Sequence, residues 1–145
     1  MKPALMLFAL VLAAPALASE PAPTPTPAAK APATAPAIAD PAGFADALDA
    51  CTAATHSAPH PFMKGFTIEH TITGEAGGGC AYSQTMPGDM RMECQLSASG
   101  RGGLAGEFRE QAQGRMSGGT GKQPAWTGEC EIVGKDGKRT PLSGG

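Results

Sequence analysis

The chain has 145 residues, with 11 Lys and Arg against 13 Asp and Glu and a formal net charge of -2. This near-neutral balance gives no general electrostatic reason to bind nucleic acid or an anionic membrane, and we expect no nucleic-acid partner. All 20 glycines lie from Gly43 onward, whereas nine of the 14 prolines precede position 42. The chain is therefore not one uniform domain.

Residues 1–18 have the order of a secretory signal peptide. Lys2 precedes an apolar run over residues 4–14, and Pro15 with small residues follows it. We expect cleavage after Ala18 and a periplasmic or secreted protein. The apolar run is shorter than the roughly 20 residues of a spanning helix, and no cysteine near the cleavage site could carry a lipid. No stable membrane insertion is therefore expected after cleavage.

Residues 19–39 consist almost entirely of Ala, Pro, Thr and Ser, and six of them are prolines. Such a segment cannot bury enough apolar surface to offset its chain entropy, so we predict a disordered tether. The folded part should then occupy residues 40–142 as one small domain.

The first element predicted in this domain is a helix over residues 41–54. Asp40 suits the N-cap, and the proline after it suits the first helical position. Apolar residues recur at helical spacing and share one face: Phe44, Ala47, Leu48 and Cys51. Pro59 and Pro61 exclude a continuing helix, so residues 55–61 are expected to form an irregular connection.

Three strands are predicted next, because apolar and polar side chains alternate over residues 66–73, 80–86 and 90–97. The turn at residues 87–89 joins the last two strands as a hairpin. Alternation with a period of two is typical of strands that bury one face only, so these strands should cover a core on one side.

A second, weaker helix is predicted to begin after Ser97 or Ser99, either of which can cap it. Its apolar face would hold three residues: Leu104, Phe108 and Ala112. A glycine-rich loop over residues 116–124 and a last strand over residues 126–133 complete the domain. The predicted fold class is α+β: an N-terminal helix packed on an antiparallel β-meander, a weak second helix, a final C-terminal strand and two disulfides.

The four cysteines fall at inward-facing positions of a chain predicted to be exported, which indicates two disulfides. If Met86 lies opposite Met90, Cys80 and Cys94 are diagonal neighbours about 7 to 8 Å apart, which is too far to bridge comfortably. Cys51 should therefore take one of these two and Cys130 the other. Of the two arrangements we favour Cys51 with Cys94 and Cys80 with Cys130.

The order of several features resembles that of small exported proteobacterial proteins of uncharacterised function. These features are Cys51 after an amphipathic helix, His60-Pro61-Phe62, Cys80 with Tyr82, Met86-Pro87, and Met92 with Cys94. The resemblance covers residues 44–110 and implies an α+β arrangement without implying an activity. The C-terminal part with Cys130 lies outside it.

Histidine and methionine side chains form one candidate metal site. The residues concerned are His56, His60, His70, Met63, Met86, Met90 and Met92. Imidazole and thioether ligands suit Cu(I), so copper binding in the periplasm is one alternative function. The competing interpretation is that the methionines on the strands, in phase with Cys94 and Leu96, fill a thin core.

The sequence holds no hydrolase, phosphate-loop or dinucleotide motif, so we predict no catalytic residue and no cofactor. The favoured function is a non-enzymatic binding or interaction domain in the cell envelope, with an unknown protein or small ligand as partner. Trp126 is the candidate anchor for a partner. A small secreted hydrolase or inhibitor is a further alternative, which a pocket joining Glu69 and Glu93 would favour.

Overall fold

A computed structural model describes residues 35–115 and 123–143. The predicted leader, most of the predicted tether and most of the predicted loop at residues 116–124 lie outside these residues. The elements follow the order α1 (Pro41–Asp49), β1 (Ala54–Pro59), β2 (Thr67–Ala76), β3 (Gly79–Met86), β4 (Met90–Leu96), α2 (Ala98–Ala112), the 3₁₀ helix η1 (Ala125–Glu129), β5 (Cys130–Val133) and β6 (Arg139–Pro141).

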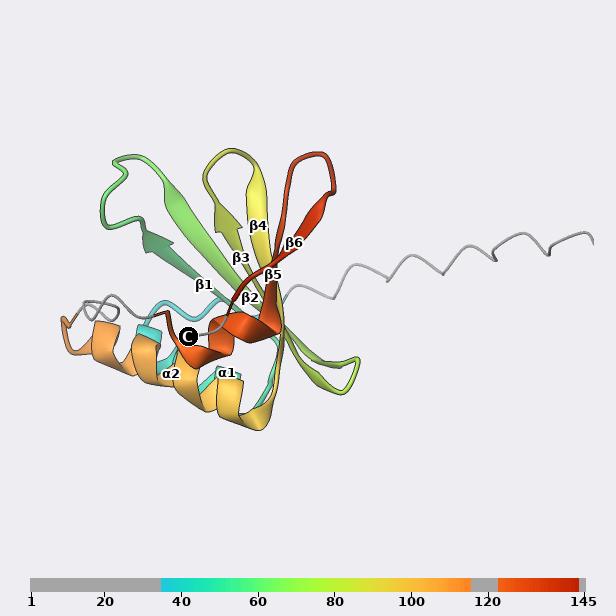
Figure 1. Ribbon diagram of the computed structural model, residues 1–145. Coiled ribbons are helices and arrows are strands. Elements are labelled where there is room, and N and C mark those ends of the chain that lie inside the picture. Colours follow the sequence, from blue (N-terminus) through green and yellow to red (C-terminus); the bar gives the residue numbers. More distant parts are fainter. Residues whose placement is uncertain (1–34, 116–122, 144–145) are drawn as a thin grey trace, which may run out of the picture. The chain divides into compact units, whose positions relative to one another are not determined.

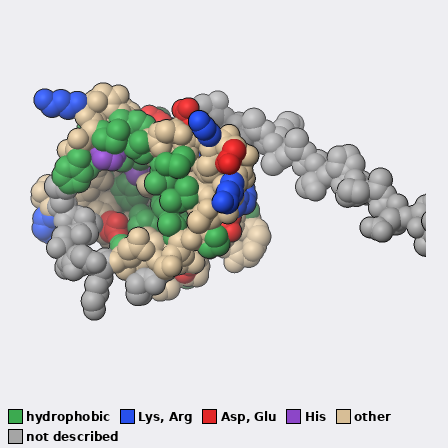
Figure 2. All heavy atoms as spheres, turned by 45° about the horizontal axis from the view of Figure 1, so that its top comes forward, with side chains coloured by type: hydrophobic (Ala, Val, Ile, Leu, Met, Phe, Trp, Pro, Cys, Tyr) green, Lys and Arg blue, Asp and Glu red, His purple; other side chains and the backbone are tan. Residues whose placement is uncertain are grey.

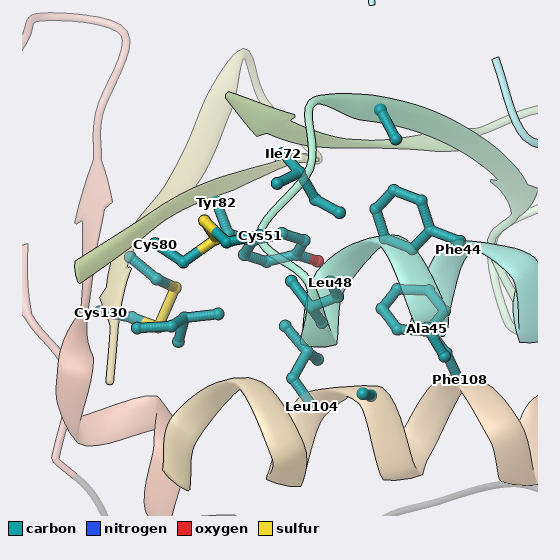
Figure 3. Close-up of a cluster of buried hydrophobic side chains, with 14 of the residues drawn as sticks. Phe44, Ala45, Leu48, Cys51, Ile72, Cys80, Tyr82, Leu104, Phe108 and Cys130 are labelled. Carbon is teal, nitrogen blue, oxygen red and sulfur yellow. A yellow bond between two sulfur atoms is a disulfide. The ribbon is translucent and has the colours of Figure 1, made fainter. Parts of the chain in front are cut away.

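The six strands form one antiparallel sheet in which each strand pairs with its neighbours in sequence. Both α-helices cover the same face of this sheet (Figure 1). Between these layers, Phe44 and Ala45 of α1 and Leu104 and Phe108 of α2 are buried against the sheet, where Ile72 lies (Figure 3). The α+β meander predicted from the sequence is therefore confirmed.

Helix α1 begins as predicted, because the Asp40 carboxylate accepts hydrogen bonds from the N–H groups of Ala42 and Gly43, each at 2.9 Å. It ends at Asp49, five residues before the predicted end at residue 54. Cys51 adopts a left-handed conformation with φ of 49°, and the N–H groups of residues 51 and 52 bond back to the carbonyls of residues 48 and 47. This closing pattern is a Schellman motif, which turns the chain out of the helix.

The segment predicted to be irregular contains strand β1. Its residues alternate between buried and more exposed positions, with Ala54, His56 and Ala58 buried, and it pairs with β2 along its length. On its other edge, Thr55 exchanges backbone hydrogen bonds with residues 36 and 38. The prediction was wrong because Pro59 stands at the end of the strand, where a missing N–H does not interrupt the ladder.

The hairpin of β3 and β4 has the predicted register. Met86 lies opposite Met90, Tyr82 opposite Cys94, and Cys80 opposite Leu96. Within β2 a register irregularity between residues 72 and 74 accompanies Gly74, which has φ of 108°. On each of these strands, every second side chain points toward the helices.

Ser97 caps helix α2, since its hydroxyl accepts from the N–H of Gly100. Leu104 and Phe108 are buried as predicted, whereas Ala112 is exposed, and Ala105 is buried in addition. The final strand begins at Cys130 rather than at residue 126, because residues 125–129 form the 3₁₀ helix η1. A sixth strand, β6, which the sequence pattern did not predict, pairs with β5.

Two disulfides join Cys51 to Cys80 and Cys94 to Cys130, and no cysteine is free. The favoured pairing of Cys51 with Cys94 and Cys80 with Cys130 is therefore wrong, although Cys80 and Cys94 are not joined to each other. The reason is strand register: Cys94 and Cys130 are directly opposed on β4 and β5, which places their side chains on one face of the sheet. Only Cys80 then remains for Cys51.

Candidate functional site

A cavity of about 330 Å³ lies between the helix-facing side of β1–β3 and helix α2. This volume is at the lower end of the range for small-molecule sites in proteins. Apolar side chains form much of its wall, among them Ala58, Ile68, Leu104 and Phe108. Figure 2 shows a hollow on this part of the surface with hydrophobic side chains around it, histidine near its rim and an acidic side chain inside.

Three polar side chains on the wall of the cavity form a hydrogen-bonded chain. The Tyr82 hydroxyl donates to Oε1 of Gln84 at 2.9 Å, and Nδ1 of His70 lies 2.7 Å from the Tyr82 oxygen. Because the hydroxyl proton is given to Gln84, His70 must be the donor to Tyr82. This assignment puts the proton of a neutral His70 on Nδ1 and leaves a lone pair on Nε2.

Burial sets the protonation states in this chain. Burial, with a smaller contribution from the neighbouring His56, lowers the pKa of His70 from 6.5 to about 4. Burial also raises the pKa of Tyr82 well above its usual range, and the charge of Glu107 adds to the rise. At neutral pH both groups are therefore uncharged, so the cavity presents hydrogen-bonding dipoles rather than ions at this wall.

Glu107 and Trp126 form the opposite polar wall. The indole N–H of Trp126 donates to Oε1 of Glu107 at 2.8 Å, and both residues line the cavity. Burial raises the pKa of Glu107, which the hydrogen bond from Trp126 partly offsets and the nearby Glu110 reinforces. Trp126, the single tryptophan of the chain, is therefore half-buried against α2 and is not the centre of an exposed patch.

His56 lies beside the cavity wall in a stack of rings. Its ring centroid is 5.4 Å from that of Phe44 and 5.8 Å from that of His70. Its Nδ1 lies 2.8 Å from the carbonyl oxygen of Ile38 and so carries a proton. Nε2 of His56 is buried and has no hydrogen-bond partner in the part of the chain that the structure describes.

The candidate copper ligands are distributed over several places. His56 and His70 are register partners on β1 and β2, whereas Nδ1 of His60 accepts hydrogen bonds from the backbone in the turn after β1. Met86 and Met90 oppose each other at the turn between β3 and β4, and a buried Met92 belongs to the core. Over residues 35–115 and 123–143 no group of three or more His, Cys, Asp or Glu is placed to hold a metal ion.

The carboxylates considered for hydrolysis lie on the outer face of the sheet. Glu69 on β2 accepts a hydrogen bond from Ser57, and Glu93 on β4 forms ion pairs with Arg91 and Arg139. Strand β3 lies between the two strands. Neither carboxylate lines the cavity, so the structure does not join them in a pocket.

Sequence reasoning named His70 and Trp126 but missed Tyr82, Gln84 and Glu107 as site residues. Tyr82 and Gln84 could have been found from the sequence, because they alternate in step with the inward-facing Cys80 and so lie on the same face of the strand. The position of Glu107 on the cavity wall could not be predicted in this way, since it depends on how α2 lies over the sheet.

Comparisons with models of protein families, with curated proteins and with solved structures find no match to this chain. Neither helix in the described part of the chain has the length and apolar content that crossing a bilayer requires.

Proposed function

We propose that this protein is a non-enzymatic binding domain of the cell envelope, and that its ligand is a small molecule with an apolar body held in the cavity between β1–β3 and α2. The observation that carries the proposal is the combination of apolar walls with the ordered chain of His70, Tyr82 and Gln84. Ligand sites typically join a mostly apolar surface to a few fixed polar groups that orient the ligand.

The chemistry of the walls favours an uncharged, hydrogen-bonding group on the ligand. Nε2 of neutral His70 can accept a hydrogen bond, and the side-chain oxygen of Gln84, which has two lone pairs, can accept a second one beside that from Tyr82. An alcohol, phenol or amide would match these groups, whereas a carboxylate facing His70 would meet a lone pair. The aromatic rings of Phe108 and Trp126 suit a planar apolar body.

A binding function fits the groups present better than catalysis does. The hydroxyl beside His70 is the phenol of Tyr82, whose raised pKa makes it a poor nucleophile, and its proton is already given to Gln84. Because all four cysteines are in disulfides, none offers a free thiol as a nucleophile. The same disulfides are consistent with export, which supports the predicted signal peptide and a periplasmic or secreted location.

The test is a fluorescence titration of the exported protein with N-phenyl-1-naphthylamine, an uncharged apolar probe that carries one N–H donor. We expect saturable binding with energy transfer from Trp126, because the indole borders the cavity. Absence of saturable binding by this probe would argue against the proposal.

Two cavity variants and one control variant test whether the probe binds in the cavity. Ala58→Phe adds a ring at a buried wall position of β1 and should weaken probe binding at least about tenfold, since bound apolar area is lost. Ala81→Phe makes the same change on the outer face of β3, where the neighbours Cys80 and Tyr82 point inward, and should leave binding unchanged. Ile68→Phe is a second cavity variant at a half-buried position, and thermal unfolding verifies that each variant is folded.

A further inference from the structure

All the large hydrophobic side chains that the described residues expose lie at one end of the sheet. Phe62 is 81% exposed, Met63 44% and Met90 36%. Phe62 and Met63 belong to the turn between β1 and β2, and Met90 directly follows the turn between β3 and β4. Figure 1 shows that these two turns and the turn between β5 and β6 project from the same end of the sheet. We call this end the three-turn end, comprising residues 60–66, 87–90 and 134–138.

The first of these turns is held in a fixed conformation by its own hydrogen bonds. Nδ1 of His60 accepts from the N–H groups of Phe62 and Met63 at 3.1 and 3.0 Å. The His60 N–H donates to the carbonyl of Phe66 at 2.9 Å, and Gly65 supplies a φ of 81°. An ordered turn therefore presents two apolar side chains to water, which the stability of the fold does not require.

The three-turn end also carries three lysines without ion-pair partners; among the other cations that the structure describes, only Arg115, at the cavity beside α2, likewise forms no ion pair. Lys64, Lys135 and Lys138 lie in its turns, and none of them forms an ion pair with any residue that the structure describes. Asp89 and Asp136 are the acidic residues of the same turns. By contrast, Arg91, Arg101, Arg109 and Arg139 all pair with carboxylates. Apolar tips flanked by unpaired lysines are complementary to the interface of an anionic bilayer.

The turns form one continuous surface rather than three separate tips. A shallow hollow of about 730 Å³ on the outer side of the sheet is bordered by Phe66 from the first turn, Gly88 and Met90 from the second, and Lys135 from the third. Pro61, next to Phe62, also lines the cavity between the sheet and α2, so one side of this surface adjoins the mouth of that cavity.

We propose that the three-turn end binds the surface of an anionic membrane, with Phe62 and Met63 entering the interfacial region and the lysines contacting lipid headgroups. This contact is peripheral and reversible, and it does not depend on the cavity holding a ligand. An aromatic and a thioether side chain with nearby lysines supply the two contributions that interfacial binding combines, apolar burial and electrostatic attraction.

The test is co-sedimentation of the exported protein with vesicles of phosphatidylcholine and phosphatidylglycerol in equal parts, beside vesicles of phosphatidylcholine alone. We expect binding to the anionic vesicles and much weaker binding to the uncharged ones. The double variant Phe62→Ser with Met63→Ser should lower the partition coefficient at least about tenfold, from the lost apolar burial. Lys64→Gln with Lys135→Gln should lower binding to anionic vesicles about fivefold for each lysine removed.

Matched variants separate the surface from the rest of the molecule. Arg101→Gln removes a cation near the opposite end of the sheet, where it pairs with Glu75, and should leave vesicle binding unchanged. Phe62→Trp should retain binding, and brominated lipids should quench its emission beyond any quenching of Trp126 in the unchanged protein. Phe62, Met63, Lys64 and Lys135 are exposed, so unfolding temperatures of their variants should change little.

Binding that survives loss of Phe62 and Met63, or that is equal on both vesicle types, would overturn the proposal. Failure to bind either vesicle would also overturn it, and capture of a soluble protein by Phe62 and Met63 in that case would identify the surface as a protein interface. The cavity proposal is distinguishable: Ala58→Phe should retain vesicle binding, and the Phe62 and Met63 variant should retain the apolar probe.

Discussion

His70 is an ionisable side chain held in an apolar interior, and its surroundings decide how the domain responds to acid. Its ring centroid lies 5.0 Å from that of Phe108 and 5.8 Å from that of His56, and Tyr82 is its hydrogen-bond partner. Protonating His70 would place a charge beside aromatic rings and a second imidazole, which burial disfavours. The same burial keeps the imidazole neutral, as the proposed ligand site requires.

Acid should therefore destabilise the fold through His70. Its pKa is about 4 in the folded state against 6.5 for the ordinary side chain, so the unfolded chain binds the extra proton between these values. The unfolding free energy should fall as pH falls through this window, by up to about 3 kcal/mol, and His70 should contribute no further slope below it. Denaturant unfolding measured from pH 7 to about pH 4 tests this expectation.

Substituting His70 tests whether this pH dependence of the unfolding free energy comes from that residue. His70→Gln should remove most of the His70 contribution because glutamine does not titrate, whereas His60→Gln, in the exposed turn, should retain it. An unchanged pH dependence in His70→Gln would contradict this account. The other titratable side chains beside His70 or on the cavity wall are His56, Tyr82, Glu107 and Arg115, and both variants leave them unaltered.

At the scale of elements, a contact between distant segments fixes the start of α2. The Glu129 carboxylate, at the end of η1, accepts hydrogen bonds from the backbone N–H and the hydroxyl of Ser97 at 2.6 and 2.7 Å. Gly100 is close to this carboxylate: a Cβ atom there would lie 2.4 Å from Oε2 of Glu129. The four glycines of α2 lower its intrinsic helix propensity, but Gly100 makes room for this contact.

Glycine-to-alanine substitutions should therefore have opposite effects within one helix. Gly106→Ala meets no neighbouring atom within 4 Å and should raise the unfolding free energy by up to about 1 kcal/mol through helix propensity. Gly100→Ala should instead lower it by about 1 kcal/mol or more, because the Ser97 and Glu129 hydrogen bonds are displaced. Equal stabilisation by both substitutions, measured by chemical denaturation, would show that this contact contributes little.

Local patterns predicted some elements well and others poorly. The hairpin register followed from alternation and from the length of one turn, because both act between neighbouring residues in the chain. Strand β1 was missed because its pairing with β2 and with residues 36–38 is not visible in its own proline-containing sequence. The cavity depends on the placement of α2 over β3, and no local pattern specifies that distance.

At the scale of the whole molecule, one disulfide links α1 to the sheet and the other reinforces the pairing of two strands that are far apart in sequence. Cys51 links the segment after α1 to the start of β3, and Cys130 links β5 to β4. The pairing could not be predicted without the register of β5, which begins only after η1. A small domain with a thin core depends strongly on such bonds.

Removing either disulfide should lower stability substantially. The bonds close loops with sequence separations of 29 and 36 residues, for which the chain-entropy relation gives about 3.5 to 4 kcal/mol each. Cys51→Ala with Cys80→Ala, and Cys94→Ala with Cys130→Ala, should therefore unfold at much lower denaturant concentrations than the unchanged protein. Peptide mapping without reduction should find only these two pairs, and a peptide joining Cys51 to Cys94 would contradict the fold.

The measurement that tests the cavity most directly is a heteronuclear NMR titration of the protein with N-phenyl-1-naphthylamine. We expect the largest shift changes on the Trp126 indole N–H and on the amides of Tyr82, Gln84 and Phe108, while the outer face of the sheet stays unaffected. Shift changes confined to Phe62 and Met63, or no saturable change at all, would contradict the assignment of this cavity as the ligand site.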